Sequence, residues 1–125
     1  MDDTTAAAIQ QGMDSFMATF GRVPDNFQLL AEHAPEAFAG YGLMRAMVMR
    51  DRPEGALDLK TKELIFALLD TLAGQNTGAK NHARAAMKLG LTIPELAEGL
   101  VQVIMVGGIT TWNKTGAEVL RHCVE

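Results

Sequence analysis

Apolar residues recur at spacings of three and four along most of this chain, which is the pattern of helices with one buried side. Few runs are rich in β-branched residues, so the pattern indicates no strand. We therefore predict an all-α fold, a single-domain bundle of six or seven helices over residues 1–125. The predicted helical segments are residues 4–20, 24–33, 35–50, 59–73, 79–89, 93–107 and 110–122.

Capping residues mark where several of these helices begin and end. Either Thr4 or Thr5 can cap the first helix, and Gly21 ends it by taking the left-handed conformation. Asp58 is expected to cap the fourth. The clearest local signal is Thr92-Ile93-Pro94-Glu95, which has the pattern of a capping box. A helix is therefore predicted to begin there.

The fourth predicted helix carries two acids away from its expected core side. At about 100° per residue, Glu63 and Asp70 lie nearly opposite the predicted core stripe, and they are ~10 Å apart along the axis. They share their strip with Phe66, and a solvent-facing strip would not normally be so apolar. We expect this strip to meet another helix, a subunit or a ligand. The predicted core stripe consists of Ile65, Leu68, Leu69 and Leu72.

The next predicted helix directs a histidine inward. Lys80, Arg84 and Lys88 are spaced by four and form a basic outer face. His82 lies ~200° from Lys80 around the helix, so it points the other way. Residues 74–78, just before this helix, are weak helix formers and are expected to form a turn or a frayed start.

Glu63, Asp70 and His82 together indicate a small interior polar site, because burying ionisable groups costs free energy unless they find partners. We take this site as the candidate active site. A satisfied core histidine and an acid at an interface would give the same pattern. The residues alone therefore leave the catalytic and the structural interpretations open.

Composition limits the classes of function. The formal net charge is -4 and the 11 lysines and arginines are spread along the chain, so we expect no nucleic-acid partner. The one cysteine, Cys123, excludes an internal disulfide, a Cys-x-x-Cys pair and a cysteine-rich zinc site. The sequence has no Glu-x-x-His or His-Glu-x-x-His motif and only 3 histidines, so we expect no metal and no cofactor.

The N-terminal residues predict the compartment. Met1-Asp2-Asp3-Thr4-Thr5 is acidic where a secretory signal carries basic residues, and no apolar run approaches the ~20 residues that span a bilayer. We expect a cytoplasmic protein with no membrane partner.

Three stretches of the chain together resemble one known family. They are FGRVPDNFQLLAEHAPEAF at residues 20–38, KELI at residues 62–65 and NHARAAMKLG at residues 81–90. In this order they resemble the carboxymuconolactone decarboxylase and alkylhydroperoxidase D superfamily, over nearly the whole chain. The resemblance implies an alkylhydroperoxidase D-like helical fold, assembly as a homotrimer or homohexamer, and a site near the subunit contacts.

The family's site combines a glutamate on one helix with a Cys-x-x-Cys-x-x-x-His motif that opens the next. The resemblance places the glutamate at Glu63 and the histidine at His82, with the two cysteines on Gln75 and Gly78. Neither of these side chains can act as a thiolate nucleophile, and Cys123 lies far from the motif in sequence. The chain is more similar to the decarboxylase branch, which also lacks the cysteine pair and keeps the histidine.

Similarity to the decarboxylase branch implies a small carboxylated lactone as substrate, which loses carbon dioxide and is then protonated, in the breakdown of aromatic acids. His82 is the predicted proton donor, because histidine titrates near neutrality, and Glu63 would orient and charge it. Gln75 and Gly78, at the start of the helix, are predicted to bind the substrate, since helix N-termini favour negative charge.

Two further residues are candidates for the binding site. Asp70 is expected at a subunit contact, with a place in the pocket as the alternative. Trp112 is a candidate wall of the site, although a single tryptophan on a terminal helix is more often a packing residue.

Two other functions remain open at this point. One is an alkylhydroperoxidase D-like peroxidase or reductase with a displaced thiol. The other is a catalytically silent binding or scaffold protein that kept the fold.

Overall fold

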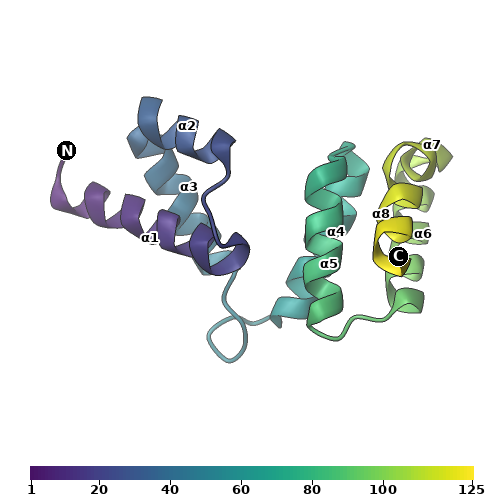
Figure 1. Ribbon diagram of the computed structural model, residues 1–125. Helices are drawn as coiled ribbons and strands as arrows, with labels where there is room; N and C mark the ends of the chain where they lie inside the picture. Colours follow the sequence, from purple (N-terminus) through teal and green to yellow (C-terminus); the bar gives the residue numbers. More distant parts are fainter. The chain divides into compact units, whose positions relative to one another are not determined.

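The computed structural model describes all 125 residues, and every regular element in it is helical (Figure 1). The elements are α1 (Asp3–Phe20), α2 (Asp25–His33), α3 (Pro35–Val48), α4 (Leu59–Ala73), α5 (Asn76–Lys88), α6 (Ile93–Gly107), α7 (Ile109–Thr111), the π-helical turn η1 (Trp112–Gly116) and α8 (Ala117–Val124). This confirms the predicted all-α class. No helix is both long enough and apolar enough to cross a membrane.

The chain divides into two compact units, Met1–Gly55 and Ala56–Glu125, and each is described by itself. The single-domain organisation over residues 1–125 stays a prediction.

In the first unit, α1 and α3 touch backbone to backbone. A Cβ atom on Gly42 would lie 2.6 Å from the Cα atom of Gly12, so neither position has room for a side chain. Beside this contact Phe16 and Phe38 are fully buried. The guanidinium of Arg45 lies 4.4 Å from the centre of the Phe16 ring. This unit is therefore built around a glycine contact and an aromatic cluster.

In the second unit, α4 and α5 lie side by side and are joined by only two residues, Gly74 and Gln75, so they run antiparallel (Figure 1). Small side chains fill their contact and let the two helices approach closely, and larger ones from α6 and α8 cover it. The fully buried members of this core cluster are Ala67, Ala79, Ala83, Ala86, Leu96, Leu100 and Val119.

Several helix ends agree with the sequence predictions. Asp58 caps α4 by accepting a hydrogen bond of 2.7 Å from the backbone N–H of Thr61. Gly21 ends α1 in the left-handed conformation, with φ of 73°. The capping box at Thr92 and Glu95 is formed at the start of α6.

Three predicted helix boundaries were wrong. Asp2, rather than Thr4 or Thr5, caps α1, because its carboxylate accepts from a backbone N–H of the first turn and also complements the helix dipole. Helix α5 begins at Asn76, before residue 79, because Asn76 is bonded to η1. The last predicted helix is interrupted by η1.

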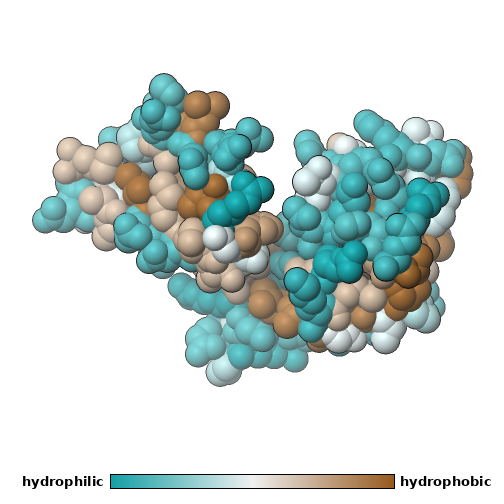
Figure 2. Space-filling view, in the orientation of Figure 1, coloured by the Kyte–Doolittle hydropathy of each residue, from teal (hydrophilic) through white to brown (hydrophobic).

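The predicted core stripe of α4 was wrong at three of its four positions. Leu68 is partly buried and packs against the core cluster. Ile65, Leu69 and Leu72 are 39%, 56% and 43% exposed, whereas the fully buried side carries Glu63 and Thr71 with an alanine between them. The hydrophobic pattern marked the side with the largest apolar residues, but α5 packs against the side whose residues are small enough for close contact. Figure 2 shows hydrophobic side chains reaching the surface of each unit.

Candidate active site

Glu63 and His82 form the centre of the candidate site. Glu63 stands on the buried side of α4, and His82 stands on the neighbouring antiparallel helix, α5. His82 Nδ1 lies 3.3 Å from Glu63 Oε2, within hydrogen-bond distance, and donates to it when that nitrogen carries a proton. The side chain of Glu63 is 2% exposed and that of His82 is 18% exposed. The imidazole therefore joins a buried carboxylate to a partly open edge of the site.

The second oxygen of the Glu63 carboxyl group, Oε1, is buried and has no hydrogen-bond partner. A buried acceptor without a partner costs about 1–3 kcal/mol, and more when it is charged. Native proteins rarely leave such a group without a partner, and an ordered water molecule or a catalytic role is the usual explanation. The carboxylate thus has one oxygen for His82 and one still to be satisfied.

Phe66 is a site residue that the sequence reasoning placed on the right strip but did not select. Its ring centre lies 4.9 Å from that of His82, with the two planes at 33°. It follows Glu63 by one turn of α4, so the signal that could have found it was the i, i+3 spacing. The ring covers one side of the imidazole and limits its contact with water.

Asp70 is half-buried and lies one turn of α4 after Phe66, toward the connection to α5. Burial raises the pKa of the Asp70 carboxyl group, and the positive charge of His82 partly lowers it again. A Cβ atom on Gly78 would lie 2.4 Å from Asp70 Oδ2, so the carboxyl group lies in the space that a side chain at position 78 would occupy. The structure thus brings Asp70 and Gly78 together, beside His82.

The start of α5 is tied to η1 by side-chain hydrogen bonds. Asn76 donates to the backbone carbonyl of Lys114 at 3.2 Å and to the Glu118 carboxylate, and it accepts from the hydroxyl of Thr115 at 2.6 Å. Gln75, just before it, donates its backbone N–H to the carbonyl of Asp70 at 2.9 Å, and its side chain is exposed. These contacts fix the first turn of α5 beside the site.

Comparison with known proteins identifies the family of the chain. The model of the carboxymuconolactone decarboxylase family matches residues 35–121. The chain belongs to this family. None of the curated proteins compared with it matched.

A solved structure is similar over almost the whole chain. It is a provisionally named carboxymuconolactone decarboxylase from Burkholderia xenovorans LB400, 36% identical, with a TM-score of 0.84. The similarity covers 96% of this chain and 91% of that one. The fold is therefore that of a family member throughout.

In this carboxymuconolactone decarboxylase family member, the one thiol is poorly suited to be a nucleophile. Burial raises the pKa of Cys123, and Arg84 only partly offsets this. Arg84 lies two residues after His82, which puts it on the opposite side of α5. At neutral pH the Cys123 thiol is therefore protonated, and a thiol reacts far more slowly than a thiolate.

Trp112 packs against the core cluster of the second unit. Its ring lies 3.1 Å from the place that a Cβ atom on Gly116 would take. This is the packing role that its position on a terminal helix favours, and its predicted place in the wall of the site stays a prediction.

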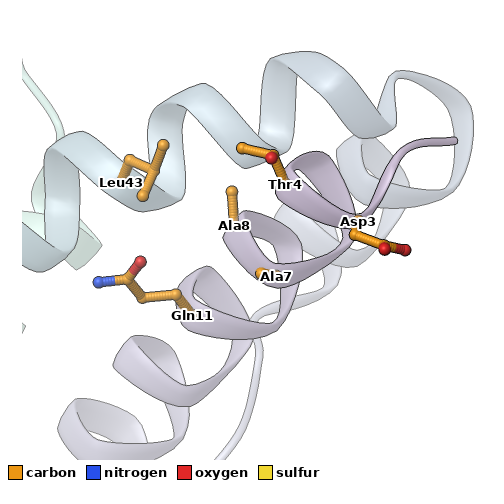
Figure 3. Close-up of a pocket in the computed structure, with 6 residues that line it drawn as sticks. All are labelled: Asp3, Thr4, Ala7, Ala8, Gln11 and Leu43. Atoms are coloured by element: carbon orange, nitrogen blue, oxygen red, sulfur yellow. The ribbon is translucent and has the colours of Figure 1, made fainter.

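The first unit has an open groove of about 430 Å³, drawn in Figure 3. One carboxylate and one amide stand at its edge, and no histidine lines it. No cluster of three or more His, Cys, Asp and Glu side chains that could hold a metal ion occurs in the chain. The pair of Glu63 and His82 lies in the second unit. The groove is lined by Asp3, Thr4, Ala7, Ala8, Gln11 and Leu43.

Proposed function

We propose that this chain is a decarboxylase-like enzyme that uses Glu63 and His82 to move a proton on a small carboxylated, lactone-type substrate. The observation that carries the proposal is the pair itself. His82 is hydrogen-bonded to a carboxylate that is 2% exposed and whose other oxygen has no partner. Membership of the carboxymuconolactone decarboxylase family supports the choice of substrate class.

The reaction requires one bond cleavage and one proton transfer. The bond between the ring carbon and the carboxylate breaks, its electron pair enters the conjugated lactone as a dienolate, and carbon dioxide leaves. The protonated imidazole of His82 then donates its proton to carbon and becomes neutral, and it regains a proton from water. The enzyme is thereby returned to its starting state.

Glu63 has two roles in this scheme. Its Oε2 atom accepts from Nδ1 of His82, which fixes the orientation of the ring and stabilises its positive charge. Its Oε1 atom is available to accept from a hydroxyl group or a water molecule that accompanies the substrate. A positioned acid of this kind typically contributes 10²–10⁴-fold in rate.

The first turn of α5 is the proposed anchor for the substrate carboxylate. The backbone N–H groups at the start of a helix have no partner within the helix, and the dipole there favours negative charge. Gln75 adds an exposed amide at this end, whereas the space beside Gly78 is taken by the Asp70 carboxyl group. The anchor would lie one turn of α5 before His82.

The test is release of carbon dioxide from a carboxylated muconolactone by purified variants. His82→Gln should lose 10²–10⁴-fold in kcat, because it removes the proton donor. Glu63→Gln should lose less, since the ring remains but is no longer held by a negative charge. His122→Gln, in α8, and Cys123→Ser should keep the wild-type rate.

Other outcomes would favour other functions. Full activity of His82→Gln, or no turnover by the wild-type chain, would overturn the proposal. Peroxide reduction that disappears in Cys123→Ser would instead identify a peroxidase with a displaced thiol. If the wild type, His82→Gln and Glu63→Gln all bind the lactone equally well and none of them turns it over, the chain is a silent binding protein.

We further propose that the chain assembles as a homotrimer or homohexamer. Met105 and Val106 on α6 are 80% and 81% exposed, and Leu69 on α4 is 56% exposed. Large exposed apolar side chains at this density are typical of surfaces that meet another protein. The resemblance to the family implies a site near the subunit contacts, and such an assembly would provide those contacts.

A further inference from the structure

We infer that Asp70 is a second carboxylate of the candidate site, which acts on His82 through space, and that Gly78 is the position that gives it room to do so. Its part in turnover rests on the proposed function. Its contact with α5 does not.

Helix geometry places the four residues on facing sides. Asp70 follows Glu63 by seven residues, so both point from the same side of α4. Gly78 precedes His82 by four residues, so both lie on the same side of α5. In the antiparallel pair, Glu63 contacts His82. Asp70, two turns further along α4, lies against Gly78, which is one turn before His82 on α5.

The contact between Asp70 and Gly78 is close. A Cβ atom built on Gly78 would lie 2.4 Å from Oδ2 and 3.3 Å from Cγ of Asp70. Any side chain at position 78 would therefore displace the carboxyl group. Because the displaced atoms form the end of a flexible side chain, the carboxyl group would swing away and the helices would keep their places.

The electrostatic link between Asp70 and His82 follows from the same placement. Burial raises the pKa of Asp70 and the charge of His82 lowers it. An ionised Asp70 and a positively charged imidazole attract each other.

Other charged side chains near α4 and α5 contact groups other than Asp70. Lys80 of α5 lies 3.8 Å from Glu118 of α8. The ammonium end of Lys114 in η1 lies beside Gly74, and Glu95 closes the capping box of α6. His82 is thus the cation that acts on Asp70, while Glu63 is the acid already bonded to the ring.

Two carboxylates around one imidazole exceed what a structural histidine needs. A core histidine is satisfied by one hydrogen bond of the kind that Glu63 supplies. A second acid that makes no hydrogen bond to the ring adds a negative charge to the site. Asp70 is therefore a second charged group of the site, beside the residue that is proposed to donate the proton.

The test is a carbon-13 NMR titration of the aspartate carboxyl groups in the full chain. Asp70→Asn removes one signal and so identifies Asp70. In the wild type its midpoint should lie above 3.8. In His82→Gln the midpoint should rise further, because the neighbouring cation is gone. In Gly78→Ala it should fall back toward 3.8, because the carboxyl group is pushed into water.

Gly40→Ala is the matched control, since Gly40 is also helical and a Cβ atom there would meet nothing within 4 Å. It should leave the Asp70 midpoint unchanged. An unchanged midpoint in His82→Gln would overturn the electrostatic link. An unchanged midpoint in Gly78→Ala would overturn the role of Gly78.

Activity provides a separate readout. In the decarboxylation assay, Asp70→Asn should change the pH–rate profile relative to the wild type, because it removes a negative charge from the site. Asp70→Glu should bring the profile part of the way back. The expected NMR shifts in a chain that turns over no carboxylated lactone would refute the proposed function and leave this inference standing. Normal turnover with no NMR shift would refute this inference and leave the proposed function standing.

Discussion

Glu63 illustrates how a single residue can cost the fold free energy and serve the site. Its carboxyl group is 2% exposed and only one of its oxygens is bonded. A buried Gln or Met at this position would be easier to accommodate. The sequence made this residue visible, because an acid on an apolar strip is unusual and because the family spacing matched it to His82.

Asp70 gives a prediction at the same scale. Its pKa in the folded chain is raised above the usual 3.8, so the folded state holds this proton more tightly than the unfolded chain. The free energy of unfolding must then decrease as pH rises from about 3.8 through the folded-state pKa. Asn cannot ionise, so Asp70→Asn should be more stable than the wild type at pH 7.

Urea unfolding at several pH values checks this. The advantage of Asp70→Asn should shrink as the pH falls below 3.8, where both chains are neutral at this position. Glu98→Gln, an exposed acid of α6, should show no comparable trend. A stability difference that does not vary with pH would contradict the assigned cause.

At the scale of the helices, the sequence predicted several helix ends correctly but did not predict which side of α4 is buried. Asp58, Thr92 and Gly21 act through local geometry, which a sequence states directly. The buried side of α4 depends on which helix packs against it, and the small residues that permit close packing carry little hydrophobic signal. The π-turn η1 was not predictable either, because its register depends on Asn76, far away in the sequence.

The contact of α1 with α3 gives a prediction for whole elements. Gly42→Ala would place a methyl group 2.6 Å from the Cα atom of Gly12, so the two helices must move apart. Overpacking of this kind costs about 1–3 kcal/mol. Gly40→Ala lies in the same helix with open space around it and should be neutral or stabilising by up to about 1 kcal/mol. Thermal unfolding of both variants is the measurement, and equal melting temperatures would refute the close contact.

At the scale of the whole molecule, the apolar surface of α4 and α6 supports the proposed assembly. Leu69→Lys should weaken it, because burying a lysine in a contact costs free energy unless it is paired. Light scattering after gel filtration should give three or six times 13.5 kDa for the wild type and a smaller mass for the variant. Glu98→Gln, also on the surface of α6, is the control. A wild-type mass of 13.5 kDa would refute the assembly.

The candidate site could be predicted only in part, because some of its contacts depend on how two helices pack against each other. Glu63 and His82 were found from spacing, and the structure brings them within 3.3 Å. Phe66 and the contact of Asp70 with Gly78 depend on how two helices face each other, which no local pattern records.

The bonds from Asn76 to Lys114 and Thr115 join segments 38 and 39 positions apart. Residues of η1, near the end of the chain, therefore help to hold the first turn of α5 in place. Shortening the chain before Trp112 would remove these bonds and release the opening turn of α5, the proposed anchor for an anion, even though Glu63, Asp70 and His82 would all still be present.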